Sequence, residues 1–238
     1  MAYDVTRKME IEIIVEKISD SGKKIALPDE ALDIVKLSGI DVPVHILVKS
    51  PGEAIEASAE IGFPLVMKVA STEAIHKSEA GGVVLGIQGV QEVEENYNNI
   101  IANLKRETPN VQISGILLQK QIPEATHLIV GGLHDEQFGP VVMFGMGGVL
   151  VELFKDVSFR IAPVTKVEAL EMIREIKAYP ALSGYRGSKA LDIEQIVKTV
   201  IIISDLITNI STIKEVELNP LLAYEKDVMA VDAKVILR

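Results

Sequence analysis

Residues 65–87 read LVMKVASTEAIHKSEAGGVVLGI, two apolar runs around a polar loop. The runs Leu65–Ala70 and Val83–Ile87 have the length and the β-branched composition of buried strands. The loop between them ends in two consecutive glycines, Gly81 and Gly82. Because glycine lets backbone N–H groups approach an anion closely, this loop is typical of a site that binds phosphate.

Three side chains in this stretch carry the chemistry. Lys68 interrupts the first apolar run, and His76 and Lys77 lie in the loop. A lysine is costly to keep inside a buried strand unless its ammonium group has a partner. Two interpretations stay open on these residues alone: a phosphate-binding loop, or a lysine that reaches a sheet edge beside an exposed histidine.

Outside this stretch, helical and extended segments alternate along the chain. Apolar residues recur at helical spacing in six other segments, and the strands between them are short and bounded by glycine or proline. We therefore predict an α/β or α+β protein whose last two strands form an antiparallel hairpin. The predicted helices are 8–18, 28–37, 51–61, 91–106, 166–178 and 192–209, and the predicted strands are 65–70, 83–87, 115–121, 127–133, 140–144, 213–218 and 228–237.

The C-terminal hairpin carries a group of oxygen-bearing side chains. Strand alternation puts Glu217 and Asn219 on one face. If the hairpin turn has an even number of residues, Asp232 shares that face with Asn219, whereas a three-residue turn would separate them unless a bulge intervened. Amide and carboxylate oxygens suit Mg²⁺, which takes one or two such ligands together with phosphates. A solvated hairpin face is the alternative.

A glycine-rich turn at residues 145–148 is followed by Glu152 and Arg160, an acid and a base that could hold a phosphate and its metal ion. The turn lacks the third glycine of a dinucleotide-binding turn. The chain also contains no G-x-x-x-x-G-K-[ST] sequence, which excludes a P-loop.

Composition excludes several classes of protein. The formal net charge of −10 argues against nucleic acid or an anionic membrane as a partner, because both need a basic surface. The absence of cysteine excludes disulfides, a thiolate nucleophile and a cysteine-bound metal. No apolar run reaches the roughly 18–20 residues of a membrane span, and no signal sequence is evident, so we expect a cytoplasmic protein.

From about residue 27 onward, these stretches resemble the β subunit of ADP-forming acetyl-CoA synthetases, in the succinyl-CoA synthetase superfamily. Four ordered matches at similar spacings carry the resemblance. They are Phe63-Pro64-(x)3-Lys68, the segment from His76 to Val83, the segment from Phe138 through Gly147-Gly148 to Glu152 and Asp156, and Glu217-(x)-Asn219-Pro220-Leu221 with Asp232.

The resemblance implies an ATP-grasp fold, in which two lobes clamp a nucleotide. Residues 1–117 would form the N-terminal lobe, with the N-terminal helices and the phosphohistidine loop. Residues 118–238 would form the C-terminal lobe, with the nucleotide and Mg²⁺ sites. The implied reaction converts acyl-CoA, ADP and phosphate reversibly to the free acid, CoA and ATP. A larger CoA-binding α subunit would be the partner, in a heterotetramer with two copies of each subunit.

The resemblance also assigns roles to residues. His76 would carry the phosphoryl group, as a neutral imidazole that is nucleophilic near pH 7, and Glu217 would orient its ring. Asn219 and Asp232 would hold Mg²⁺. The remaining candidates for binding ADP or ATP are Lys68, Lys77, Gly81 and Gly82, and the later pair Glu152 and Arg160. Leu118, Gln119 and Lys120 fall where ATP-grasp proteins present backbone groups to adenine.

One position departs from the family pattern. Family members usually have glycine-x-glutamate before the strand at 128–131, whereas this chain has Ala125-Thr126-His127. That glutamate often contacts the nucleotide, so His127 puts the preference for base or ribose in question. The alternative is that His127 packs at the start of the strand without contacting the nucleotide. The rival interpretations of the chain are an ATP-grasp carboxylate–amine ligase, a nucleotide-sensing regulatory subunit and the ATP-grasp part of a regulatory acetyltransferase.

Overall fold

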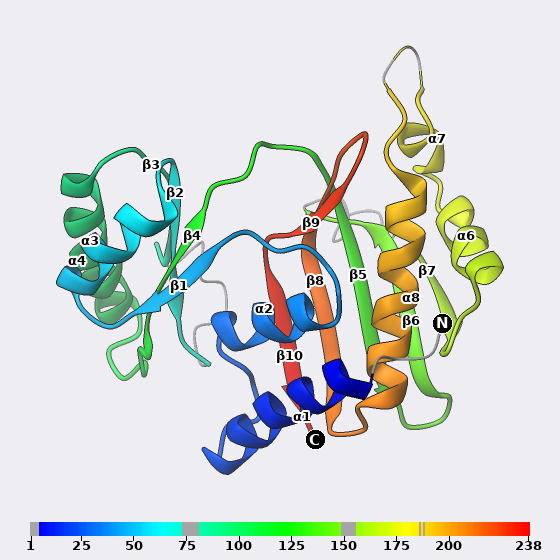
Figure 1. Cartoon of the computed structure of the whole chain (residues 1–238), viewed down its shortest axis with the longest axis horizontal. Helices are drawn as coiled ribbons and strands as arrows, with labels where there is room; N and C mark the ends of the chain where they lie inside the picture. Colours follow the sequence, from blue (N-terminus) through cyan, green and yellow to red (C-terminus); the bar gives the residue numbers. More distant parts are fainter. Residues whose placement is uncertain (1–4, 73–80, 149–155, 186, 188) are drawn as a thin grey trace. The chain divides into compact units, whose positions relative to one another are not determined.

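The structure is a computed structural model that describes residues 5–72, 81–148, 156–185, 187 and 189–238. It separates into two compact units (Figure 1). Unit 1 comprises Met1–Ala26, Glu30–Val42 and Glu124–Arg238, and unit 2 comprises Leu27–Asp29 and Pro43–Pro123. In the described part of the chain, no helix is long and apolar enough to cross a membrane.

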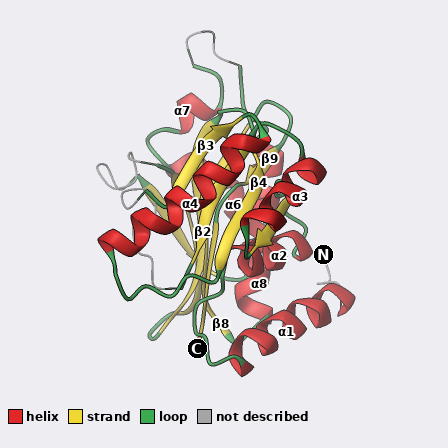
Figure 2. Cartoon of the chain, turned by 90° about the vertical axis from the view of Figure 1, so that its left-hand side faces the viewer, coloured by secondary structure: helices red, strands yellow, loops and turns green. Residues whose placement is uncertain are grey.

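Unit 2 is built on a four-stranded antiparallel sheet in the order β1-β4-β2-β3. Two helices, α3 and α4, cover one face of this sheet (Figure 2). Leu65, Met67 and Val69 point to these helices and form a core with residues such as Ile100. The elements are β1 (His45–Val48), α3 (Pro51–Ile61), β2 (Leu65–Ala70), β3 (Val83–Ile87), α4 (Val90–Glu107) and β4 (Gly115–Lys120).

Local sequence explains where α3 begins and ends. The hydroxyl of Ser50 accepts a hydrogen bond from the Glu53 backbone N–H, and Pro51 occupies the first turn, where its missing N–H costs nothing. At the other end Gly62 has φ of 74°, a conformation that other residues rarely adopt. These signals are local, and for this reason the predicted bounds of 51–61 are confirmed.

Unit 1 is built on a six-stranded antiparallel sheet in the order β10-β8-β5-β6-β7, with β9 paired to the far end of β8. The long helix α8 lies across β5 and β6 (Figure 1). Its elements are β5 (Thr126–Asp135), β6 (Gly139–Met146), β7 (Val157–Ile161), α6 (Lys166–Glu175), α7 (Tyr179–Leu182), α8 (Ile193–Asn209), β8 (Ile213–Ala223), β9 (Val228–Ala230) and β10 (Ala233–Leu237).

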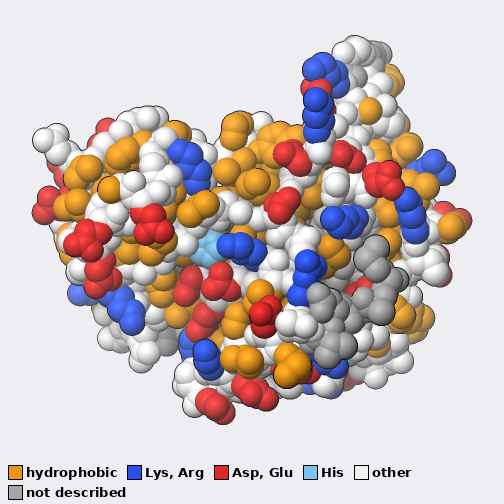
Figure 3. Space-filling model, viewed as in Figure 1, with side chains coloured by type: hydrophobic (Ala, Val, Ile, Leu, Met, Phe, Trp, Pro, Cys, Tyr) orange, Lys and Arg blue, Asp and Glu red, His pale blue; other side chains and the backbone are white. Residues whose placement is uncertain are grey.

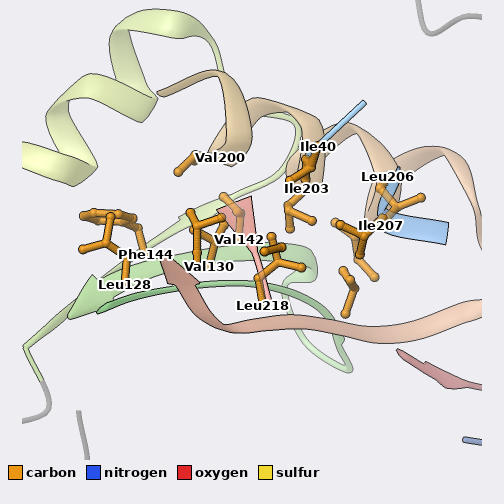
Figure 4. Close-up of a cluster of buried hydrophobic side chains, with 14 of the residues drawn as sticks. Ile40, Leu128, Val130, Val142, Phe144, Val200, Ile203, Leu206, Ile207 and Leu218 are labelled. Carbon is orange, nitrogen blue, oxygen red and sulfur yellow. The ribbon is translucent and has the colours of Figure 1, made fainter. Parts of the chain in front are cut away.

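The core of unit 1 lies between α8 and one face of the sheet. Val130, Phe144 and Leu218 point from three strands toward Ile203 and Ile207 on the helix (Figure 4). Helix and sheet approach closely at Gly132, where an added Cβ would lie 3.1 Å from the Cβ of Ile207. The sheet face that carries Val130, Phe144 and Leu218 is called the helix face below, and the opposite one the open face.

The N-terminal helices do not belong where we predicted them. α1 (Val5–Asp20) and α2 (Pro28–Leu37) contribute Ile11, Val15 and Ile34 to the core of unit 1. The backbone N–H of Ala26 also donates to the carbonyl of Val235 in β10. The boundary between the units falls between Pro123 and Glu124, not after residue 117. Chain order placed these helices in the first lobe, whereas their apolar faces pack on the sheet formed at the other end of the chain.

Candidate functional site

The C-terminal hairpin brings Asn219 and Asp232 opposite each other. Leu218 pairs with Ala233, and Leu221 with Ala230, so the register between them puts residue 219 against residue 232. The Asn219 N–H donates to the Asp232 carbonyl at 3.3 Å. The turn after Ala223 holds four residues before Val228, an even number, so the condition that the sequence set for a shared face is met.

Glu217 joins these residues on the open face of the sheet. Its neighbours Val216 and Leu218 point into the core beneath α8, so alternation directs Glu217 away from that helix. The Asn219 Nδ2 donates to the Glu217 Oε1 at 3.4 Å, and both side chains are half-buried. The hairpin therefore presents two carboxylates and an amide in one place.

The donor set fits a magnesium ion that is held mainly by its nucleotide. Mg²⁺ keeps several water molecules and takes one or two protein oxygens beside phosphates. Asn219 and Asp232 supply an amide and a carboxylate oxygen, and the Ala233 N–H donates to the Asp232 Oδ1 at 3.0 Å, which restrains that carboxylate. Among the described residues, no group of three histidine, aspartate or glutamate side chains converges on a metal position. The hairpin therefore offers oxygen donors of the kind and number that Mg²⁺ takes beside phosphates.

In unit 2, the candidate residues lie on the sheet face that α3 and α4 leave uncovered. Met67 and Val69 point to these helices, so Lys68 between them points the other way. Gln119 pairs with Val66 on that same face, and its side chain is buried. The carbonyl of Gly82 accepts from the Val69 N–H at 2.8 Å, which holds the end of the loop against β2. His76, Lys77 and Glu152 lie outside the described residues.

The prediction for the β4 strand needs a correction. Leu118 pairs with Ile46 on one side and Met67 on the other, and its side chain belongs to the unit 2 core. A residue in the middle of a sheet has its backbone groups engaged, so Leu118 cannot present them to an adenine ring. The Lys120 Nζ donates to the carbonyls of Gly62 and Phe63, at 3.1 and 2.5 Å, and so holds the turn before β2.

Arg160 is also in a different place from the one predicted. It pairs with Val142, which belongs to the unit 1 core, so Arg160 lies on the helix face and not with Glu217. Its Nη2 forms an ion pair with Glu175 of α6 at 2.7 Å. Alternation in Val157–Ile161 would have turned the apolar residues to the core and Arg160 to the other face, so only the pairing with β6 could show this.

Asp156, one of the residues that carry the resemblance, has a structural role in unit 1. Its two carboxylate oxygens accept hydrogen bonds from the backbone N–H groups of Lys177 and Ala178, each at 2.8 Å. These bonds satisfy two backbone N–H groups just after the end of α6. Asp156 therefore stabilises the fold on the side away from the open face.

His127 stands at the start of β5, on the strand face opposite Leu128 of the core. Its Nε2 lies 3.1 Å from the Glu124 Oε2. Its ring is also the neighbour of Gly148, whose added Cβ would lie 3.4 Å from the His127 Nδ1. A carboxylate therefore remains near this position in the chain, although it comes from residue 124 and not from residue 127.

His134 offers a test of pH dependence in unit 1. Burial lowers the pKa of His134, the positive charge of Arg238 lowers it further, and a hydrogen bond with the Ile207 backbone opposes both. Its Nε2 is buried and has no hydrogen-bond partner in the described part of the chain. The folded protein therefore favours the neutral ring.

We expect stability to fall as the pH drops below about 6.5, where the unfolded chain takes up a proton that the folded chain refuses. The slope for one proton is about 1.4 kcal/mol per pH unit, and partial solvent access keeps the effect below this. Urea unfolding of wild type and His134→Asn at pH 7.0 and 5.5 checks it, since the variant should lose less stability. Equal losses would contradict this role of His134.

Comparison with known proteins extends over most of the chain. The ATP-grasp domain family matches residues 17–237. The β subunit of acetate–CoA ligase (ADP-forming) I from Pyrococcus furiosus is 45% identical over 224 residues, which make up 94% of this chain and 96% of that protein. The acetate–CoA ligase (ADP-forming) I of Archaeoglobus fulgidus is 41% identical over 226 residues, 95% of this chain but only 33% of its own length.

A solved structure is similar over nearly the same range. It is acetyl-coenzyme A synthetase 1 of Ca. Korarchaeum cryptofilum, in complex with coenzyme A and Mg-AMPPCP, with the phosphohistidine segment pointing towards the nucleotide-binding site. The TM-score is 0.84 at 41% identity, and the match covers 96% of this chain and 100% of that one. Sequence and fold therefore agree on the same set of relatives.

Proposed function

The chain belongs to the ATP-grasp family and is a homologue of the β subunits of ADP-forming acetate–CoA ligases, and from this we propose that it is the nucleotide-binding subunit of an ADP-forming acyl-CoA synthetase. The complex would convert acyl-CoA, ADP and phosphate to the free acid, CoA and ATP, in either direction. The observation that carries the proposal is the hairpin on which Asn219 and Asp232 stand opposite each other beside Glu217.

The residues of this chain would act on the phosphoryl group in two transfers. In the first, an imidazole nitrogen of His76 attacks the phosphorus of a phosphohistidine that the partner α subunit forms from the acyl phosphate, that P–N bond breaks, and the partner's imidazole leaves. In the second, a terminal phosphate oxygen of ADP attacks the phosphohistidine, the P–N bond breaks, and ATP forms. Glu217 would bond to the other ring nitrogen and keep the imidazole in the reactive tautomer.

The remaining residues would bind and position the nucleotide. Lys68 and Lys77 would neutralise phosphate oxygens, while the backbone at Gly81 and Gly82 would let the loop approach them. When bound between Asn219 and Asp232, Mg²⁺ would offset the negative charge that builds up during transfer.

A partner subunit would supply the acyl chemistry. This chain matches about a third of the A. fulgidus relative, so in that protein the same region is joined to a much longer polypeptide. We propose a separate, larger CoA-binding α subunit as the partner here, with two copies of each chain. A cytoplasmic location would give this complex access to ADP, phosphate and CoA.

Co-expression tests the proposal. The chain and a candidate α subunit from the same genome would be purified together and assayed for ATP formation from acetyl-CoA, ADP, phosphate and Mg²⁺. We expect activity from the complex and none from the chain alone, with a mass that corresponds to two copies of each subunit. A stable complex that binds ADP but makes no ATP from a panel of acyl-CoA substrates would refute it and favour a regulatory nucleotide-binding subunit.

A further inference from the structure

A small cavity at the surface of unit 1 is lined by three segments that are distant in sequence. They are residues 39–41 after α2, one flank of α8 and the turn between β8 and β9. Its volume is about 270 Å³. Pockets for drug-sized ligands range from about 300 to 1,000 Å³, so this one fits a compound of a few carbon atoms.

Two lysines and two aspartates line this cavity: Lys198 on α8, Asp41 after α2, and Lys226 with Asp227 in the turn. Neither lysine forms an ion pair anywhere in the described part of the chain, although several other surface lysines do. Over α8 and the β8–β9 hairpin, acidic and basic side chains lie next to one another (Figure 3). The cavity thus presents both signs of charge, two of each.

We propose that this cavity binds a small zwitterion of amino-acid size, which carries one carboxylate and one ammonium group. Its carboxylate would meet Lys198 and Lys226, and its ammonium group would meet Asp41 and Asp227. A ligand with a single charge would be attracted by the pair of opposite charge and repelled by the other pair. It would therefore bind more weakly than a zwitterion.

The cavity is directly connected to the hairpin that carries Asn219 and Asp232. Asp227 and Val228 line it, and the Ala230 N–H in β9 donates to the Asp41 carbonyl at 2.9 Å. Ala230 precedes Asp232 by two residues. A ligand of the cavity would therefore contact the same hairpin that carries the proposed Mg²⁺ ligands. The proposed function concerns only those ligands, and the binding of the zwitterion does not rest on it.

Ligand binding is measured by NMR saturation transfer and by thermal shift with L-alanine, glycine and 4-aminobutyrate. Propionate and propylamine, which each carry one of the two charges, serve as matched controls. We expect at least one zwitterion to bind with a millimolar dissociation constant, at least tenfold more tightly than either control. The double variant Lys226→Gln/Asp227→Asn should weaken that binding at least tenfold, and Arg106→Gln, which removes a surface ion pair with Glu107 on α4 of unit 2, should leave it unchanged.

The assignment would be overturned if none of the three zwitterions bound, if the one-charge controls bound equally well, or if the double variant bound equally well. Repeating the titration with Asp232→Asn separates this site from the nucleotide site. Zwitterion binding that survives in that variant supports a distinct cavity even if no phosphoryl transfer is found, and binding lost there places the ligand at the nucleotide site and refutes the proposal.

Discussion

Replacement of His76 by alanine is expected to lower ATP formation by the assembled complex by at least about 10³-fold. The variant would keep the nucleotide site but would have no nitrogen to accept the phosphoryl group. Because direct transfer from acyl phosphate to ADP would require both substrates in one place, we expect little residual activity. ADP binding should change less than threefold, which would separate loss of the relay from loss of the nucleotide.

The covalent intermediate gives a second measurement of the same prediction. Wild-type complex incubated with Mg-ATP should gain acid-labile phosphate, which mass spectrometry would locate at His76. The control is His134→Asn, a half-buried histidine of unit 1 that has no part in the proposed relay, which should label like wild type. If phosphate labelling persisted in His76→Ala, another residue would have to carry the phosphoryl group. If the wild-type complex bound ATP but gained no label, the relay would be refuted altogether.

Substitution of Asp232 by asparagine is expected to weaken Mg²⁺-dependent ADP binding by roughly 100-fold. Asparagine has nearly the same shape and keeps an oxygen that can accept from the Ala233 N–H, so the hairpin register should survive. What disappears is the negative charge opposite Asn219. The loss of ADP affinity therefore measures the contribution of the Asp232 charge and not a change in the folding of the strand.

Calorimetric titration of ADP with 5 mM MgCl₂ and with EDTA, which removes the metal ion, would check this prediction. In wild type Mg²⁺ should tighten binding strongly, and in Asp232→Asn the two titrations should nearly coincide. Glu225→Gln is the matched control, because Glu225 lies in the turn of the same hairpin and pairs only with Lys189 in the described residues. An unchanged Mg²⁺ effect in Asp232→Asn would place the metal elsewhere.

Several elements were predictable because their signals are local. The glycines and capping residues around 51–61 and the apolar runs at 65–70 and 83–87 gave the bounds that the structure shows. The sequence missed β1, β7 and α7. These elements are short, and Val157–Ile161 contains Ser158 and Arg160 on its buried side, where an amphipathic strand would carry apolar residues.

The candidate site was only partly predictable, because turn length and strand register decide which of its residues meet. Residue spacing suggested that Glu217, Asn219 and Asp232 belong together, but the number of residues in the turn was needed to decide it. Arg160 follows the glycine-rich turn in sequence, yet the register of β7 with β6 puts it on the helix face with Glu175. Leu118 was assigned from family position, and pairing on both sides of β4 removes its backbone from any ligand.

The sequence by itself determined the class of fold, the two strands around the loop at residues 71–82 and the family to which the chain belongs. These depend on periodicity, capping and ordered motifs, which are properties of neighbouring residues. Only the tertiary structure decided that the N-terminal helices pack on the C-terminal sheet and that Asn219 faces Asp232. It alone brought Asp41, Lys198 and Asp227 to one cavity. Such contacts join residues far apart in the chain, and they are set by which apolar faces are buried together.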